Sequence, residues 1–451
     1  MSEPLRITVI GTGYLGATHA AAMAESGFDV LGVDVDPAKI ASLARGEVPF
    51  YEPGLPELLA SNVASGRLRF TTDYAEAAEF GDLHFIGVGT PQHPRTNAAD
   101  LRQVHGAIDA LAPLLTRPCT VVGKSTVPVG TAATVRERLQ SQAPAGADVD
   151  LVWNPEFLRE GFAVADTLTP DRIVVGLADP AAPGQPATRD EEVMRRVYAP
   201  MIEWGSPFLV VDYATAELVK VAANSFLATK ISFINAMAEV CEATGADVTR
   251  LAQAIGLDER IGSKFLRAGI GFGGGCLPKD IRAFMARAGE LGVSDALSFL
   301  RDVDSINTRR RSSTVALARE LVGGRFVGKR IAVLGAAFKP DSDDVRDSPA
   351  LDIAAAIYTA GGDVVVHDPQ AMANARAAYP NMAYASSVQE ALTGADLVLL
   401  LTEWRDYTQL DPAAVAGLPT RPLVLDGRNA LDPARWRAAG WQYRGLGRPN
   451  A

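Results

Sequence analysis

Apolar runs about as long as one strand alternate with longer helical stretches along most of the chain. In the first half, the predicted strands span residues 5–10, 29–33, 67–71, 83–88, 119–124, 149–153, 173–177 and 208–211. Several runs are apolar at nearly every position, which is typical of strands that helices cover on both faces. The alternation therefore predicts a parallel, doubly wound sheet.

A helical section separates this pattern from a second one like it. Residues 214–243 are helix formers that are apolar on several faces, so we expect a long helix that joins two domains and contributes to a subunit interface. Further helices are expected over 281–291 and 298–321. A second set of strands is expected over residues 330–334, 363–367, 397–401 and 423–425.

The first strand runs into a glycine turn, GTGYLG, which an alanine-rich helix and a second strand follow. This order is the fingerprint of a dinucleotide-binding, Rossmann-like fold. Gly11 makes the tight turn, Gly13 lets a pyrophosphate approach the backbone, and Gly16 packs the helix on the strand. Asp34 ends the second strand, where a carboxylate binds the adenosine ribose and repels a 2′-phosphate. NAD is therefore expected rather than NADP.

A lone cysteine, Cys276, lies in the glycine-rich stretch GIGFGGGCLPKD. Pro278 is favoured in the first turn of a helix, so the thiol is expected just ahead of a helix N-terminus, where the peptide dipoles favour a thiolate. The three glycines 273–275 would leave the backbone open to a substrate. The alternative is a glycine-rich turn with a buried, inert cysteine. The stretch alone leaves both interpretations open.

Polar residues follow several predicted strands at the edge where such sheets bind ligands. The sequences are GTP at 89–91, KSTVPVGT at 124–131 and NPEFLREG at 154–161. Ordinary turn chemistry is a plausible alternative for the first two sequences, and a less plausible one for the carboxylate of Glu156.

Further candidate charges lie on the central helix and in the second half. Lys220 and Asn224 lie one turn apart, where they could stabilise an oxyanion, although spacing alone favours a lysine that reaches solvent. Lys339 and Arg428 follow strands of the second half, where they are either contacts to an anionic, nucleotide-like ligand or ordinary surface cations.

NAD and an activated cysteine together restrict the reaction. A thiolate can capture an aldehyde as a thiohemiacetal, whose oxidation gives a thioester that water hydrolyses. This chemistry predicts the oxidation of an alcohol to an acid in two steps. Lys220 and Asn224 would stabilise the oxyanion, and Glu156 or Asp280, with Thr126, would position or deprotonate water.

The chain resembles the UDP-glucose/GDP-mannose dehydrogenase family over nearly its whole length. The motifs that carry the resemblance are GTGYLG, YEPGL at 51–55, KSTVPVGT, NPEFLREG, the Lys220/Asn224 pair, FGGGCLPKD and FKPDSDDVRDSP. The resemblance implies two Rossmann-like doubly wound domains joined by a long central helix at a dimer interface. The expected parts are an NAD-binding domain over 1–212, a helical dimerisation region with the cysteine loop over 213–322, and a UDP-sugar-binding domain over 323–451.

The resemblance also implies an activity, which is the NAD-dependent, two-step oxidation of UDP-glucose to UDP-glucuronate with Cys276 as nucleophile. The implied catalytic residues are Cys276, Lys220, Asn224, Asp280, Glu156 and Thr126. A dehydrogenase of GDP-mannose or of a UDP-N-acetylhexosamine is the alternative, and a non-catalytic NAD-binding protein is a second one. The cysteine, lysine, asparagine and aspartate argue against the second, because a binding protein needs no nucleophile.

By the same resemblance, binding residues map onto this sequence. The implied cofactor contacts are Gly11, Gly13, Tyr14, Leu15, Gly16, Asp34, Lys39, Thr90, Thr126, Glu160, Lys279 and Arg346. The implied substrate contacts are Glu156, Phe157, Leu158, Arg159, Glu160, Lys220, Asn224, Arg260, Phe265, Arg267, Phe272, Gly273, Phe338, Lys339 and Arg428, with Arg260 supplied by a partner subunit. Many relatives have serine where this chain has Gly275, so a more flexible loop is expected here.

Composition narrows the partners further. The net charge of −10 disfavours nucleic acid. No apolar run is long enough to span a bilayer, and the N-terminus leads directly into a strand, so we expect no membrane partner and a cytoplasmic location. The three cysteines cannot all pair, and the five histidines have no metal-ligand spacing, so no metal is expected.

Overall fold

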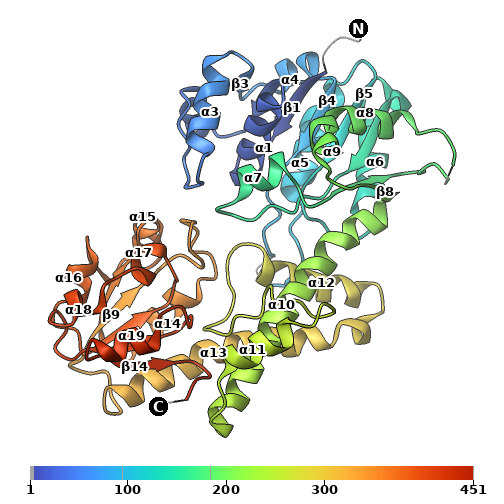
Figure 1. Ribbon diagram of the computed structural model, residues 1–451. Helices are drawn as coiled ribbons and strands as arrows, with labels where there is room; N and C mark the ends of the chain where they lie inside the picture. Colours follow the sequence, from blue (N-terminus) through green and yellow to red (C-terminus); the bar gives the residue numbers. More distant parts are fainter. Residues whose placement is uncertain (1–4, 94, 183, 450–451) are drawn as a thin grey trace. The chain divides into compact units, whose positions relative to one another are not determined.

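The protein forms two compact units, residues 1–223 and 224–451. The structure is a computed structural model that describes residues 5–93, 95–182 and 184–449 (Figure 1). Helix α10 (Tyr213–Thr244) runs from the first unit into the second. Within the described ranges, no helix is both long and apolar enough to cross a membrane.

The first unit is built on a sheet with strand order β3-β2-β1-β4-β5-β6-β7-β8. Its strands are β1 (Arg6–Ile10), β2 (Asp29–Val33), β3 (Leu68–Thr71), β4 (Leu83–Ile86), β5 (Cys119–Gly123), β6 (Val149–Trp153), β7 (Ile173–Leu177) and β8 (Phe208–Asp212). The six strands from β3 to β6 are parallel to their neighbours, as the sequence predicts.

The expectation of a wholly parallel sheet is wrong at one pair. Strand β7 meets β6 in the antiparallel sense, through Trp153 and Gly176, and β8 then runs parallel to β7. Between β6 and β7 the chain forms only the short helix α7 (Ala163–Leu168). It makes no helical crossover of the kind that brings a chain back for a parallel strand, so β7 starts at the edge where β6 ends.

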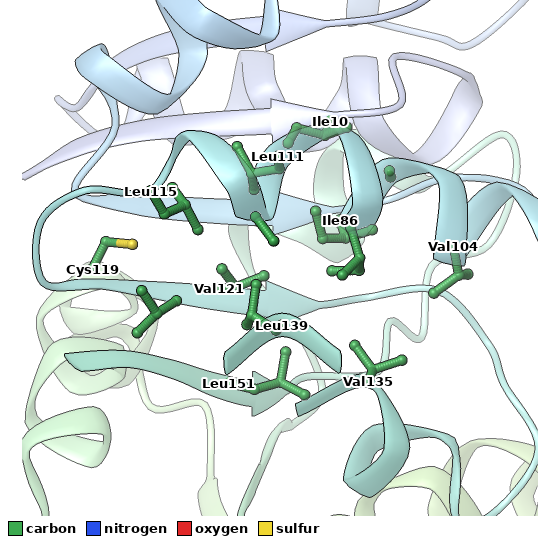
Figure 2. Close-up of a cluster of buried hydrophobic side chains, with 14 of the residues drawn as sticks. Ile10, Ile86, Val104, Leu111, Leu115, Cys119, Val121, Val135, Leu139 and Leu151 are labelled. Carbon is green, nitrogen blue, oxygen red and sulfur yellow. The ribbon is translucent and has the colours of Figure 1, made fainter. Parts of the chain in front are cut away.

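Helices cover both faces of this sheet. They are α1 (Tyr14–Glu25), α2 (Pro37–Ala44), α3 (Leu55–Ala64), α4 (Tyr74–Phe80), α5 (Arg102–Leu111), α6 (Thr131–Gln142), α8 (Arg189–Val197) and α9 (Ala199–Trp204), with short 3₁₀ turns η1 (Ala112–Leu114) and η2 (Gly146–Asp148). Figure 2 shows one core layer, in which α5 and α6 pack against strand residues such as Ile10 and Val121. Neighbouring positions such as Val9 and Val122 point to the other face, where α1 and α3 pack.

The second unit repeats the arrangement with an entirely parallel sheet of order β11-β10-β9-β12-β13-β14. The strands are β9 (Arg330–Leu334), β10 (Asp363–His367), β11 (Ala383–Tyr384), β12 (Leu397–Leu400), β13 (Leu423–Asp426) and β14 (Gln442–Gly445). Numbered within the unit, this order is 3-2-1-4-5-6, the order of a dinucleotide-binding fold. The first six strands of the first unit have the same order, so the prediction of two Rossmann-like sheets and a long central helix is confirmed.

The remaining helices of the second unit precede its sheet or connect its strands. Those before the sheet are α11 (Val248–Gly256), α12 (Leu277–Glu290), η3 (Ser294–Leu297) and α13 (Phe299–Leu321). Those among the strands are α14 (Pro349–Thr359), α15 (Met372–Ala378), α16 (Val388–Leu392), α17 (Arg405–Thr408), α18 (Pro412–Val415) and α19 (Pro433–Ala438). Helix α12 starts at Leu277, earlier than the expected range of 281–291. The prediction from Pro278 that Cys276 lies just ahead of a helix N-terminus is confirmed.

Candidate active site

The glycine turn of the first unit has the geometry that a dinucleotide requires. Gly11 has φ +90°, and a side chain there would lie 2.8 Å from Val88. A Cβ atom at Gly16 would lie 1.8 Å from the Gly11 carbonyl oxygen, so only glycine lets helix and turn pack this closely. At Gly13, a Cβ atom would meet no atom of the described residues within 4 Å, which leaves the N-terminus of α1 open to an anion.

A cavity of about 630 Å³ lies beside this turn. Of the predicted cofactor contacts, Gly11, Gly13, Asp34 and Lys39 line it. Tyr74 and Gln103 also line it and were not predicted, because neither belongs to the glycine fingerprint. A nicotinamide dinucleotide fits this donor set, with a helix N-terminus for the pyrophosphate and a carboxylate for the ribose.

Asp34 is held as an ionised carboxylate. Its Oδ2 accepts hydrogen bonds from the Thr12 backbone N–H at 2.9 Å and from Lys39 Nζ at 2.9 Å. Partial burial acts to raise the pKa of this carboxyl, but Lys39 and the backbone donors outweigh burial and hold the pKa below its usual value.

Tyr14 connects the glycine turn to the 154–161 loop through a residue that sequence reasoning missed. Its hydroxyl donates to Glu52 and accepts from the Gly161 N–H at 3.0 Å. Glu52, which is buried, also accepts from the Gly161 N–H at 2.6 Å and from the Ala163 N–H at 2.7 Å. Burial and Glu52 together raise the pKa of Tyr14. The motif YEPGL carried the signal, because a glutamate among apolar residues requires buried donors.

The polar strand ends of the first unit place two groups of predicted residues together. Thr90 Oγ1 donates to the carbonyl oxygen of Thr126 at 2.8 Å, which links the loops after β4 and β5. Glu156 Oε1 lies 2.9 Å from Lys220 Nζ, and both side chains are largely buried. The favoured alternative for Lys220, a side chain that reaches solvent, is therefore wrong. Arg159 points elsewhere, since it forms an ion pair with Asp166.

Cys276 is exposed and forms the N-cap of α12 in the second unit. Helix α10 brings Asn224 to the same helix, where its Nδ2 donates to Asp280 Oδ2 at 2.6 Å. Lys279 Nζ lies 2.7 Å from the other oxygen of this carboxylate, which is only 2% exposed. Four predicted residues thus lie together at the N-terminus of α12. The Asn224 amide and the Lys279 ammonium orient the Asp280 carboxylate, which lies one helical turn from the Cys276 thiol.

A pocket of about 320 Å³ in the second unit is lined by seven of the fifteen predicted substrate contacts. These are Phe265, Arg267, Phe272, Gly273, Phe338, Lys339 and Arg428. Gly269 and Gly271 also line the pocket and lie within residues 265–273, onto which the resemblance maps the substrate contacts. Sequence reasoning missed Ile231, Asn235, Leu277 and Glu403. The Arg428 guanidinium donates to the carbonyl oxygens of Leu401, Gly271 and Phe338, so it also ties the pocket walls together.

Arg260 does not line this pocket of its own chain, and its largely exposed side chain forms an ion pair with Asp258. Its contact with the substrate of a partner subunit stays a prediction. One prediction about this region needs correction. The glycines 273–275 are not simply open to a substrate, because Cβ atoms there would meet Asp347 O at 2.1 Å, the Phe338 ring at 2.7 Å and Arg346 Cζ at 2.4 Å. They allow the 338–349 segment to pack on the cysteine loop, which argues against the expected flexibility at Gly275.

Two Rossmann-like units, one with a dinucleotide cavity and one with a thiol beside a second pocket, define an NAD-dependent oxidoreductase. Comparison with known proteins gives the family. Residues 5–202, 214–309 and 332–433 match the NAD-binding, central and UDP-binding domains of the UDP-glucose/GDP-mannose dehydrogenase family. The chain belongs to this family.

Individual relatives match over nearly their whole length. A UDP-glucose 6-dehydrogenase of Rhizobium meliloti (strain 1021) is 42% identical, over 99% of this chain and 100% of the relative. A UDP-glucose 6-dehydrogenase of Pseudomonas aeruginosa is 40% identical, over 99% of this chain and 98% of the relative. Among solved structures, a UDP-glucose dehydrogenase from Pyrobaculum islandicum has a TM-score of 0.89 and 38% identity, over 99% and 98% of the chains. A UDP-D-ManNAc dehydrogenase from Pyrococcus horikoshii has a TM-score of 0.84 and 25% identity, over 99% and 100%.

Proposed function

We propose that this protein oxidises UDP-glucose to UDP-glucuronate in two NAD-dependent steps, with Cys276 as the covalent nucleophile. The observation that carries the proposal is the exposed Cys276 thiol at the N-terminus of α12, beside the Asn224–Asp280–Lys279 cluster. The UDP-binding family domain and the relatives' names support the substrate.

Each group of residues has a separate role in binding or in the first oxidation. The 320 Å³ pocket holds the nucleotide, with Lys339 and Arg428 as its cations. The Glu156–Lys220 pair, with Thr126, takes the hydroxyl proton as the alcohol becomes an aldehyde. When bound, NAD accepts the hydride in each oxidation.

Cys276 then adds to the aldehyde carbon, and a carbon–sulfur bond replaces the carbonyl π bond. Lys220 and Asn224 stabilise the oxyanion of this thiohemiacetal. Loss of the second hydride leaves a thioester on Cys276. Asp280, Glu156 and Thr126 position water, whose oxygen replaces sulfur at the acyl carbon and regenerates the thiol.

We also propose that the protein acts as a homodimer in the cytoplasm. On α10, the apolar side chains of Phe226, Phe233 and Val240 are exposed and recur every seven residues, and Leu218 is exposed eight residues earlier. Such a stripe is the seam that a second copy would cover. Sedimentation equilibrium should give a dimer for the wild type and a monomer for Phe226→Glu, whereas a monomeric wild type would refute this assembly.

The test of the activity is the number of NADH molecules formed for each nucleotide sugar consumed. UDP-glucose, UDP-N-acetylglucosamine, UDP-N-acetylmannosamine and GDP-mannose are offered separately. Two NADH from each UDP-glucose, with little turnover of the others, supports the proposal. Preference for a UDP-N-acetylhexosamine, the substrate type named for the Pyrococcus horikoshii relative, would favour the alternative dehydrogenase. No turnover of any sugar would favour a non-catalytic NAD-binding protein.

A further inference from the structure

Lys124 is a buried lysine for which the proposed mechanism has no role. It follows β5, and only 7% of its surface is exposed. Its Nζ lies 2.9 Å from Asn154 Oδ1 and 3.3 Å from the Tyr198 hydroxyl, and it faces the rings of Phe85 and Tyr198. No carboxylate in the described part of the chain forms an ion pair with it. Burying a charge with only neutral partners is costly, so a lysine at this position needs an explanation.

The partner of Lys124, Asn154, is the first residue of the 154–161 loop. Its Oδ1 accepts from Lys124 and also from the Tyr198 hydroxyl, at 2.6 Å. Its Nδ2 donates to the Val174 carbonyl oxygen of β7 at 2.7 Å, and its backbone N–H donates to Gly123 of β5 at 2.8 Å. The two donors on Oδ1 orient the amide, and the oriented amide fixes the start of the loop to both neighbouring strands.

Only Pro155 separates this anchor from Glu156. Proline has a fixed φ and keeps the residue before it extended, so little rotational freedom remains between Asn154 and the carboxylate. Glu156 Oε2 accepts from the Leu158 N–H at 2.6 Å, which leaves Oε1 toward Lys220 Nζ at 2.9 Å. A displacement of Asn154 is therefore passed on to the Glu156–Lys220 pair.

We propose that Lys124 is a positioning residue for the oxidation, which holds Asn154 and thereby sets the place of Glu156 against Lys220. The inference rests on the proposed roles of Glu156 and Lys220. Lys124 itself does not touch the reacting atoms; it acts through the loop.

A small cavity beside Lys124 supports this role and makes it testable. The space that water centres can reach is about 50 Å³, and the lining includes Lys124, Asn154, Glu156 and His19. His19 Nε2 is buried there and has no hydrogen-bond partner among the residues that the structure describes. The exposed residue Asp171 also lines the cavity, so small solutes have a way in. Burial lowers the pKa of Lys124 to about 8, with Glu156 opposing and Lys220 adding to the shift, and the amine is still mostly protonated at pH 7.

The test compares Lys124→Met and Lys124→Ala with the wild type in the NADH assay. For Lys124→Met we expect kcat to fall about 10- to 100-fold, because a displacement near 1 Å at reacting groups costs up to this much, while KM for both substrates changes little. Lys124→Ala should regain part of its kcat when ethylammonium is added, because this cation can enter the cavity and donate to Asn154. The control is Lys329→Met, a half-exposed lysine that forms an ion pair with Asp396; it should retain wild-type kcat and show no effect of ethylammonium.

Two kinetic results would overturn the proposal. One is a kcat of Lys124→Met within about twofold of the wild type. The other is a loss of kcat in Lys124→Ala that ethylammonium does not reduce at any concentration, since a purely structural lysine would behave in this way. If Lys124→Met does not fold, Tyr198→Phe carries the same test, because it removes the second donor to Asn154 Oδ1; an unchanged kcat would then count against the anchor.

A crystal structure of Lys124→Met separates this inference from the proposed function. We expect the Glu156 Oε1–Lys220 Nζ distance to lengthen in the variant. An unchanged distance would overturn the positioning role even if UDP-glucose proved to be the substrate. A lengthened distance in a protein that does not oxidise UDP-glucose would retain the anchor and refute only the function.

Discussion

Replacing Lys220 with methionine should separate the energetic and chemical roles of its ion pair with Glu156. The two side chains are 6% and 13% exposed, and their charged atoms lie 2.9 Å apart. Breaking a buried pair by removing one partner costs about 3–5 kcal/mol, because the other charge stays buried. Glu156 keeps its hydrogen bond from Leu158, and methionine fills most of the space of lysine, so we expect about 3 kcal/mol, at the low end of that range.

This loss should be visible in thermal unfolding. For a unit of this size, each kcal/mol lowers Tm by about 2–4 °C, so Lys220→Met should unfold about 6–12 °C below the wild type. Its kcat should fall about 100- to 1000-fold, as is usual when one oxyanion-stabilising donor is lost.

The single variant leaves the Glu156 carboxylate buried without its ion-pair partner, and the double variant Lys220→Met/Glu156→Gln removes this charge. We expect its Tm to return most of the way to that of the wild type, while its kcat stays as low as that of Lys220→Met. A kcat that recovers together with Tm would refute the reasoning, because the lysine would then act only through stability. If Lys220→Met has the Tm of the wild type, the ion pair between Lys220 and Glu156 does not contribute to stability as a buried pair would.

Three further substitutions test other parts of the account. Cys276→Ser should still bind NAD and the nucleotide sugar, by isothermal titration calorimetry, but form no UDP-glucuronate; wild-type product formation would refute the covalent step. Asp34→Ala should lower the ratio of kcat/KM for NAD to kcat/KM for NADP by at least about tenfold. The reason is that Lys39 Nζ, which lies 2.9 Å from Asp34 Oδ2 in the wild type, can then pair with a 2′-phosphate. An unchanged ratio would refute the role of Asp34. Gly16→Ala should weaken NAD binding at least about 100-fold, because its Cβ would lie 1.8 Å from Gly11 O and force the turn to move; unchanged affinity would show that the turn tolerates the shift.

The fold could be predicted because its signals are local. Each strand is a short apolar run, and the GTGYLG turn with Asp34 lies within one strand–helix–strand unit. The reversal at β7 could not be predicted, because the direction of a strand depends on where the preceding connection leaves the chain. The apolar run 173–177 is compatible with either parallel or antiparallel pairing.

The sequence predicts candidate residues for the site, but it does not predict the contacts among them. Spacing placed Lys220 and Asn224 one turn apart, but it favoured a solvent-facing lysine, because the partner Glu156 lies far away in sequence. Glu52 and Asn154 were missed as anchors for the same reason, since their bonds join segments that only the folded sheet brings together. The glycines 273–275 were expected to leave space for a substrate, but their Cβ positions face the 338–349 segment rather than open space.

The covalent chemistry of Cys276 is the central claim, and mass spectrometry of the quenched enzyme tests it most directly. Asp280→Asn, which weakens the proposed hydrolysis and keeps the residue's size, is mixed with NAD and UDP-glucose, quenched in acid and digested. We expect the peptide that contains Cys276 to carry the UDP-glucuronyl group as a thioester, which hydroxylamine releases. Unmodified Cys276 after two NADH have formed per active site in a single turnover would contradict the account, because the second oxidation would then proceed without a thioester on the thiol.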